Sequence, residues 1–330
     1  MNNINPNLLR NNNFNSEDHF QANTSRQRLN IPKNFFVIKK DIPSHRTSDT
    51  ASDSIYIGKY INNKRNGQGK LIQSDPSFYE GNFKNDLYDG NGYFQNKNYI
   101  YKGEFLGGKK NGKGKLENLI NKTIYEGEFK NDMKNGYGIE TYNDGSIYKG
   151  NFKDEMKEGN GVLTLKNNSV YKGQFKKDKI CGKGIFKWNE KKMYNGEWEN
   201  NEISGFGILI ENNIKHIGYF SHDKKEGYGA SFYTDKKFVL VGKWINDVIE
   251  GISIIFRFNT INGHNKTRSD INDFNKNEII IIMKEGNIIN SKLNEEEIKE
   301  IKKNKEYNEM MQLYKEKFLY EYYNSINISE

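Results

Sequence analysis

The sequence predicts an all-β repeat protein: an elongated, single-layer antiparallel sheet of consecutive β-hairpins, with a disordered N-terminal tail and a C-terminal α-helix. Three observations predict it. A short motif returns about every 23 residues between positions 56 and 258, and a fixed period of this size marks repeat architectures. Only 34% of the 330 residues are hydrophobic, which is too few for a thick globular core. The last segment instead carries apolar residues at helical spacing.

The repeated motif combines aromatic residues with glycines at fixed distances. Residues 125–138 read YEGEFKNDMKNGYG, and residues 148–161 read YKGNFKDEMKEGNG. A glycine follows two residues after the opening position, an aromatic residue two later, and a second glycine nine residues after the first; in eight of the nine units a third glycine comes two residues later. The units open at Tyr56, Tyr79, Tyr101, Tyr125, Tyr148, Tyr171, Tyr194, His216 and Leu240.

Each unit has the pattern of a β-hairpin. In the stretch IYEGEF, aromatic residues and glycine alternate with glutamates, which places the two kinds on opposite faces of a strand. KNDMKN is polar turn material, and GYGIETY resumes the alternation as a second strand. Glycine weakens a strand, so its strict placement predicts either that an aromatic ring of a neighbouring strand lies over the bare backbone or that the sheet bends there.

The pattern Y-x-G-x-(F/W), followed by G-x-G on a 23-residue period, resembles the MORN (membrane occupation and recognition nexus) repeat over residues 56–258. The resemblance implies a sheet of consecutive MORN hairpins and a scaffold of the cytoskeletal, ciliary or membrane-junction kind. Two units depart from the pattern. The eighth opens with His216, and the ninth opens with Leu240 and has Ser253 in place of the third glycine. Terminal repeats are often atypical because they cap the stack.

Composition divides the chain into four segments. Residues 1–54 are an Asn- and Ser-rich tail expected to be disordered, although IPKNFFVIKKDIP at 31–43 could be a short strand or a docking peptide. Residues 55–258 hold the nine units. Residues 259–290 read as a polar loop and a capping strand, in which the apolar run 279–283 should pair with or cover the last edge of the sheet. Residues 291–330 read as one amphipathic helix.

The predicted C-terminal helix has a recognisable start and an apolar stripe. Asn294 and Glu297 stand at capping-box spacing. The stripe consists of Tyr307, Met310, Met311, Tyr314, Phe318 and Tyr322. These six residues would pack on the protein's own sheet or on a second copy, or dock the chain onto another protein.

No motif in the sequence indicates catalysis, a cofactor or a metal. Cys181 is the one cysteine, which excludes an intrachain disulfide, and the five histidines are too scattered for a zinc site. Residues 107–113 match the phosphate-loop pattern GxxxxGK, but Gly114 stands where serine or threonine is needed. The sequence therefore predicts that the protein is not an enzyme. Neither a signal peptide nor a membrane-spanning segment is expected.

Positive charge is concentrated in one stretch. Between residues 166 and 192, nine lysines face only Asp178 and Glu190. Strand alternation places Lys172 with Lys176, and Lys183 with Lys187, on shared strand faces. Such a patch could bind anionic lipid, an acidic protein tail such as that of tubulin, or nothing in particular. Nucleic acid is not expected, because no recognition helix is evident.

The predicted function is a non-catalytic scaffold for protein–protein interaction. A partner's extended segment or helix would lie along the aromatic face. The expected binding or structural groove comprises Tyr79, Phe83, Tyr101, Phe105, Tyr125, Phe129, Tyr148, Phe152, Tyr171, Phe175, Tyr194 and Trp198. The resemblance implies a cytoplasmic place in the cytoskeleton or a cilium or flagellum, including its axoneme and the membrane cortex, with cytoskeletal or axonemal protein partners.

Two further hypotheses accompany the scaffold. Two copies could form a homodimer through the end of the array or through the C-terminal helix. The alternative function is that of a peripheral membrane protein that binds phosphoinositides or other anionic lipids through Lys172, Lys176, Lys183 and Lys187.

Overall fold

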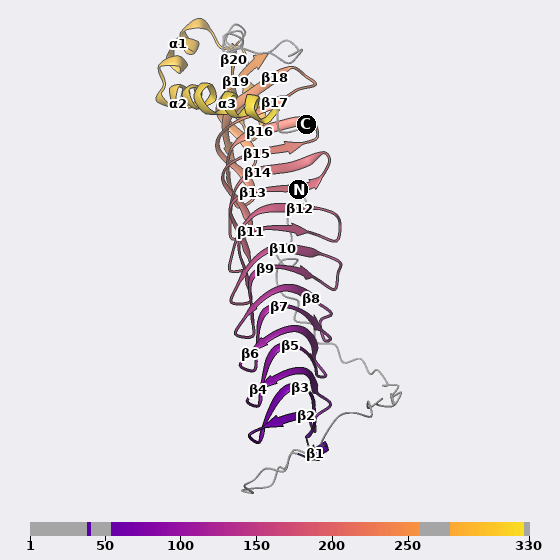
Figure 1. The fold of residues 1–330 in the computed structure, drawn as a ribbon. Helices are drawn as coiled ribbons and strands as arrows, with labels where there is room; N and C mark the ends of the chain where they lie inside the picture. Colours follow the sequence, from indigo (N-terminus) through magenta and orange to yellow (C-terminus); the bar gives the residue numbers. More distant parts are fainter. Residues whose placement is uncertain (1–37, 41–53, 258–277, 327–330) are drawn as a thin grey trace, which may run out of the picture. The chain divides into compact units, whose positions relative to one another are not determined.

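The computed structural model of the protein (Figure 1) describes residues 38–40, 54–257 and 278–326. The predictions of a disordered tail and of a polar loop at 259–277 fall almost wholly outside these residues. The chain divides into two compact units. The N-terminal unit holds strands β1–β11 together with residues 176–178, and the C-terminal unit holds β12–β21 and the helices.

In the N-terminal unit, consecutive strands pair antiparallel as predicted. Its strands are β1 (Ile38–Lys40), β2 (Ile55–Ile61), β3 (Lys64–Ile72), β4 (Phe78–Lys84), β5 (Leu87–Gln95), β6 (Tyr99–Leu106), β7 (Lys109–Asn118), β8 (Ile124–Lys130), β9 (Met133–Thr141), β10 (Ile147–Lys153) and β11 (Met156–Thr164). β1 adds to the edge of β2, so a short strand does form within residues 31–43.

In the C-terminal unit, the antiparallel pairing continues from β13 to β21. The strands of this unit are β12 (Val170–Lys176), β13 (Lys179–Asn189), β14 (Lys192–Glu199), β15 (Glu202–Glu211), β16 (Ile214–Ser221), β17 (Lys224–Tyr233), β18 (Phe238–Ile245), β19 (Val248–Arg257), β20 (Glu278–Lys284) and β21 (Asn287–Asn290). β18 and β19 form the ninth hairpin. The apolar run 279–283 lies in β20 and pairs with β19, as expected.

Two-residue turns join the strands within each hairpin. Asn131 and Asp132, between β8 and β9, have φ values of 51° and 72°. Positive φ at both central residues defines the type I′ turn, whose twist matches that of the flanking strands and which favours Asn, Asp and Gly. The same signature recurs at 62–63, 85–86, 107–108, 154–155, 177–178, 200–201, 222–223, 246–247 and 285–286.

The C-terminal helical segment is broken, which corrects the prediction of one continuous helix. It consists of α1 (Glu295–Lys303), α2 (Lys305–Leu313), the π-helical turn η3 (Tyr314–Phe318) and α3 (Leu319–Ile326). The capping box of Asn294 and Glu297 is present. Asn304 is extended, and its side chain accepts a hydrogen bond from the Glu306 N–H at 2.8 Å, so it ends α1 and begins α2.

The two faces of the sheet differ in what covers them. The face that carries the opening tyrosines, here called the tyrosine face, is covered by its own aromatic and lysine side chains. The opposite face is charged in the N-terminal unit. In the C-terminal unit it is apolar from β15 to β20, where the helices cover it (Figure 1, yellow over β16–β18). The main hydrophobic core of the C-terminal unit lies between these helices and the sheet.

Candidate functional site

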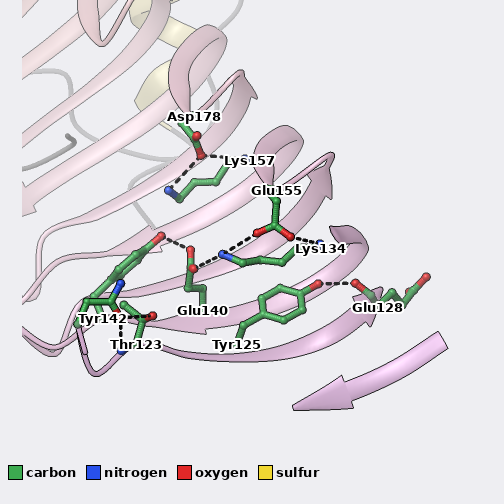
Figure 2. Close-up of polar contacts among 10 residues, drawn as sticks. Thr123, Tyr125, Glu128, Lys134, Glu140, Tyr142, Glu155, Lys157 and Asp178 are labelled. Atoms are coloured by element: carbon green, nitrogen blue, oxygen red, sulfur yellow. Dashed lines mark hydrogen bonds and ion pairs between the residues drawn. The ribbon is translucent and has the colours of Figure 1, made fainter. Parts of the chain in front are cut away.

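The ring of each opening tyrosine closes over a pair of glycines. Tyr125 lies over Gly127 of its own strand and over Gly138, which stands opposite Gly127 on the next strand. A Cβ added at Gly127 would lie 2.6 Å from the Tyr125 Oη. That hydroxyl donates a hydrogen bond of 2.9 Å to the carbonyl of Glu128 (Figure 2). The glycines are therefore required because a methyl group would occupy the place of the ring.

The middle glycine of each unit has a different role. Gly136 has φ +94°, a conformation open to glycine at little cost. The register shifts at this point between Gly127 and Phe129, where β9 carries extra residues as a β-bulge. Both explanations given for the glycines from the sequence therefore apply, each to a different glycine. The ring over Gly127 comes from the same strand, not from a neighbouring one.

The tyrosine geometry repeats in the first seven units. The hydroxyl donates to the backbone carbonyl three residues later, at 2.9–3.3 Å. Six of these rings also meet the aromatic residue of their own unit and that of the following unit edge-on: the ring centroids of Tyr125 are 5.1 Å from Phe129 and 5.0 Å from Phe152. Such T-shaped contacts each contribute about 0.5–1.5 kcal/mol beyond area burial.

Burial of this row corrects the proposed binding mode. All twelve residues of the predicted groove are between 0% and 6% exposed: Tyr79, Phe83, Tyr101, Phe105, Tyr125, Phe129, Tyr148, Phe152, Tyr171, Phe175, Tyr194 and Trp198. A partner segment cannot lie on rings that are already covered. The hypothesis that a partner contacts these rings directly is therefore wrong, because the rings cover one another.

Basic side chains cover part of the tyrosine face. The ammonium of Lys134 lies 5.4 Å from the ring centroid of Tyr125 and 5.5 Å from that of Phe152. Lys110 and Lys157 take the same place in their units, and the Arg65 guanidinium lies over Tyr56. All four occupy the position nine residues after the opening tyrosine. Cation–π attraction of this kind contributes about 0.5–2 kcal/mol.

The turn of the next hairpin holds each basic residue in place. The backbone N–H of Lys134 donates to the Glu155 carboxylate at 2.7 Å, and the Glu155 N–H donates back to the Lys134 carbonyl at 3.1 Å. Asp178 makes the same reciprocal pair with Lys157, whose ammonium it also meets at 3.4 Å. These hydrogen bonds join successive repeats through side chains as well as through the strand ladder.

A buried carboxylate interrupts the row in the fourth unit. Glu140 is 7% exposed and stands opposite Tyr125. Its carboxylate lies 2.5 Å from the Lys134 ammonium and accepts a hydrogen bond of 2.6 Å from the Tyr142 hydroxyl (Figure 2). Burial pushes the pKa of Glu140 up, but the Lys134 charge and the two hydrogen bonds outweigh it and hold the pKa below its usual value. Lys134 thus lies between Glu140 and Glu155, 3.9 Å from the latter.

The eighth unit replaces the tyrosine with a buried histidine. His216 is 2% exposed, and its Nδ1 lies 2.8 Å from the Ser231 hydroxyl. Its ring meets Trp244 at 4.7 Å. Burial, and then the charge of Lys225, hold the pKa of His216 well below its usual value. The histidine therefore fills the place of the tyrosine as a neutral ring.

The four lysines predicted to bind lipid are all exposed on the opposite face. They are not an unbroken cationic patch. Lys187 pairs with Glu190 at 2.9 Å, and Lys183 stands directly opposite Glu197 in the ladder. Lys172 and Lys176 lie on β12, two side chains apart on the same face.

The helical stripe packs on the protein's own sheet. Tyr307, Met310, Met311, Tyr314, Phe318 and Tyr322 are all buried in the main core of the C-terminal unit. Phe256 stacks on Tyr314 at 4.9 Å, and Phe232 stacks on Tyr322 at 4.1 Å. Of the alternatives left open by the sequence, packing on the protein's own sheet is the one observed. The prediction that this stripe docks the chain onto a partner is therefore wrong, because its side chains are already buried.

The row of basic side chains over the tyrosine face, here called the cation row, has a signal in the sequence. The position nine residues after the opening one is basic in five of the nine units: Arg65, Lys110, Lys134, Lys157 and Lys225. In the unit that follows each of these five, the second turn residue is acidic: Asp86, Asp132, Glu155, Asp178 and Asp247. Only the structure shows that these two positions meet.

Tandem hairpins with type I′ turns, of which the first seven each close a tyrosine over two glycines, define a β-hairpin repeat protein. The MORN repeat family profile matches residues 56–75, 79–99, 101–117, 125–147, 148–170, 171–191, 194–210 and 216–236. The chain therefore belongs to the MORN repeat family. The ninth hairpin follows the last matched segment and still has the hairpin pairing.

One solved structure with local similarity is "SAS-4 (dCPAP) TCP domain in complex with a Proline Rich Motif of Ana2 (dSTIL) of Drosophila Melanogaster", with 14% identity and a TM-score of 0.29. The match covers 51% of this chain and 91% of that chain, and a TM-score this low does not relate the two folds. No curated protein matches the sequence. None of the helices in the described residues has the length and apolar character needed to cross a membrane.

Proposed function

We propose that the protein is a non-catalytic scaffold that holds protein partners along its repeat sheet, in the cytoskeleton or in a cilium or its axoneme. The observation that carries this proposal is the repeated tyrosine–glycine ladder, in which side chains of one face satisfy one another unit after unit. The stability of an array of this kind is a sum over neighbouring repeats. Membership of the MORN family supports the scaffold role.

Exposed side chains, rather than the buried rings, are the contact groups in this proposal. The opposite face of the N-terminal unit carries Lys102, Lys115, Glu126 and Lys149 in one cross-strand row, with Ile139 between the last two. Tyr137, on the same face, is 53% exposed. A partner that binds this row needs charges opposite in sign to those of the row. Such complementarity sets specificity and association rate more than affinity.

Affinity capture of the full chain from cell lysate, followed by lysine crosslinking, tests the scaffold. We expect cytoskeletal or axonemal proteins to be retained and crosslinked to lysines of the opposite face. The variant Lys115→Glu with Lys149→Glu should lose them, whereas Lys224→Glu, in a turn-proximal position of another unit, should keep them. Equal capture by both variants would contradict the proposal.

A peripheral membrane protein is the second candidate function. The exposure of Lys172, Lys176, Lys183 and Lys187 on one face supports this function. The nearby Glu190 and Glu197 weaken the positive electrostatic potential of these lysines. Vesicles with phosphoinositide should sediment the protein at low salt, and changing the four lysines to glutamate should abolish this. Sedimentation that persists in the variant would reject this lipid site.

A homodimer through the end of the array also belongs to the proposal. The last strand, β21, exposes Ile288 and Ile289 at 55% and 60%. Light scattering across protein concentrations should show a dimer that Ile288→Lys with Ile289→Lys converts to a monomer. A wild-type chain that stays monomeric at high concentration would contradict the proposal of a homodimer.

A further inference from the structure

The second unit departs from the cation row. Where Lys110, Lys134 and Lys157 each place an ammonium between two aromatic rings, this unit has Tyr88. The Tyr88 ring stacks on Tyr79, with centroids 3.7 Å apart. It also meets Phe105 edge-on at 5.6 Å. A neutral ring with a partly exposed surface therefore replaces the intramolecular cation.

The turn that follows has also lost its charge. The third hairpin turns through Gly107 and Gly108, whereas the turns facing Lys110, Lys134 and Lys157 carry Asp132, Glu155 and Asp178. The Gly108 N–H still donates to the Tyr88 carbonyl at 2.8 Å. Because glycine has no side chain, the space beside Tyr88 is left open.

An open groove of about 580 Å³ lies at this place in the N-terminal unit. Tyr88, Leu87 and Gly108 line one part of it, and Asp86, Arg65 and Asp75 line another. The Arg65 guanidinium is held by Asp86 at 3.2 Å and lies over Phe83. Asp75 is exposed. The lining of the groove therefore holds two carboxylates, Asp75 and Asp86, against one guanidinium, beside an aromatic wall.

We propose that this groove binds a cationic side chain, arginine or lysine, presented by a basic segment of a protein partner. The protein itself shows the binding mode, since the ammonium groups of Lys134 and Lys157 lie on aromatic rings with a carboxylate beside them. In the second unit the aromatic wall is present and the cation is supplied from outside. Aromatic rings and carboxylates together favour a partly desolvated cation. This inference rests on the scaffold function and names the chemistry of one partner contact.

A labelled peptide tests the groove on the full chain. The probe is a fluorescein-labelled peptide of alternating glycine and arginine, and its matched control carries citrulline, a neutral isostere, at every arginine. We expect the arginine peptide to bind at least tenfold more tightly than the citrulline peptide in anisotropy titrations. Asp75→Asn should weaken it about fivefold, and Glu126→Gln, an exposed acid on the opposite face, should not. Equal binding of the two peptides, or no binding of either, would overturn the proposal.

The variant Tyr88→Lys provides a sharper test, because it restores the residue type of the neighbouring units and should fold. Its own ammonium should occupy the groove and reduce binding of the arginine peptide more than tenfold, with an unchanged melting temperature. Unreduced binding in this folded variant would place the peptide elsewhere. If Tyr88→Lys still captures partners but no longer binds the peptide, the scaffold function stands without this contact. If the wild-type chain binds the peptide but captures no partner from lysate, the groove stands and the scaffold function falls.

Discussion

The carboxylate of Glu140 lies 2.5 Å from the ammonium of Lys134, at a position where most other units carry an apolar side chain. Fifteen residues after the opening position, six of the other eight units have leucine or phenylalanine. The fourth unit therefore has a buried ion pair in place of an apolar contact. Replacing either residue of the pair alone leaves the charge of the other uncompensated. Removing one member of such a pair strands the other charge.

Glu140→Gln should destabilise the fold by about 3–5 kcal/mol at pH 7, because it leaves the Lys134 ammonium without its buried counterion. The folded-state pKa of Glu140 lies below its ordinary value, so the contribution of this carboxylate to stability is present above the ordinary pKa and is lost as the pH falls through the folded-state pKa. The urea midpoint of the wild type should therefore drop more than that of the variant between pH 6 and 3. Parallel pH profiles would contradict this. The exposed Glu126→Gln is the control.

Gly138→Ala should destabilise the fold by about 1–3 kcal/mol, because the new methyl group overlaps the Tyr125 ring. Tyr125→Phe removes only the hydrogen bond to the Glu128 carbonyl and should cost about 1 kcal/mol. Urea denaturation measures both. A Gly138→Ala protein with the wild-type midpoint would show that the ring does not rest on this glycine.

His216 should make the protein sensitive to mild acid. Its pKa in the folded state lies well below 6.5, so the unfolded chain binds the proton first, and stability falls as the pH drops below about 6.5. The loss reaches at most about 1.4 kcal/mol per pH unit. His216→Tyr, the residue of the first seven units, should remove the extra slope between pH 6.5 and 5, whereas His222→Gln, an exposed site, should retain it. A slope unchanged by His216→Tyr would contradict the prediction.

Phe318→Ala should cost about 3–5 kcal/mol, because Phe318 is 0% exposed in the core between the helices and the sheet. Tyr320→Ala, two residues away and 64% exposed, should change the stability by less than about 0.5 kcal/mol. Thermal unfolding of both variants measures the difference. Equal effects would mean that the helices are not docked through this side chain.

The sequence was sufficient for the hairpins because strand alternation and turn chemistry are local. The YEGEF pattern and the Asn and Asp residues of the turns predicted strands and turns unit by unit, and the Asn294–Glu297 capping box predicted the start of α1. The closure of the tyrosine face was not predictable in this way. It depends on Tyr125 reaching across Gly127 to Gly138, which is a matter of packing between strands.

The predictions for the C-terminal helical segment and for the candidate sites were incomplete for the same reason. The apolar stripe from Tyr307 to Tyr322 is compatible with a continuous helix, and the break at Asn304 arises because that side chain caps the next helix. Glu140 looks like an ordinary strand carboxylate until Lys134 and Tyr142 are seen around it. Periodicity gives the face of a residue but not the neighbours that cover it.

Nitration of tyrosines in the intact protein, mapped by mass spectrometry, is the most direct measurement of whether the tyrosine face is closed. Tyr137 and Tyr320, which are 53% and 64% exposed, should react readily. The ladder tyrosines, such as Tyr101 and Tyr125 with their 0% and 2% exposure, should react only after denaturation, because burial also raises their pKa. Rapid nitration of the ladder tyrosines in the folded chain would mean that the face is open, and that partners can bind the rings after all.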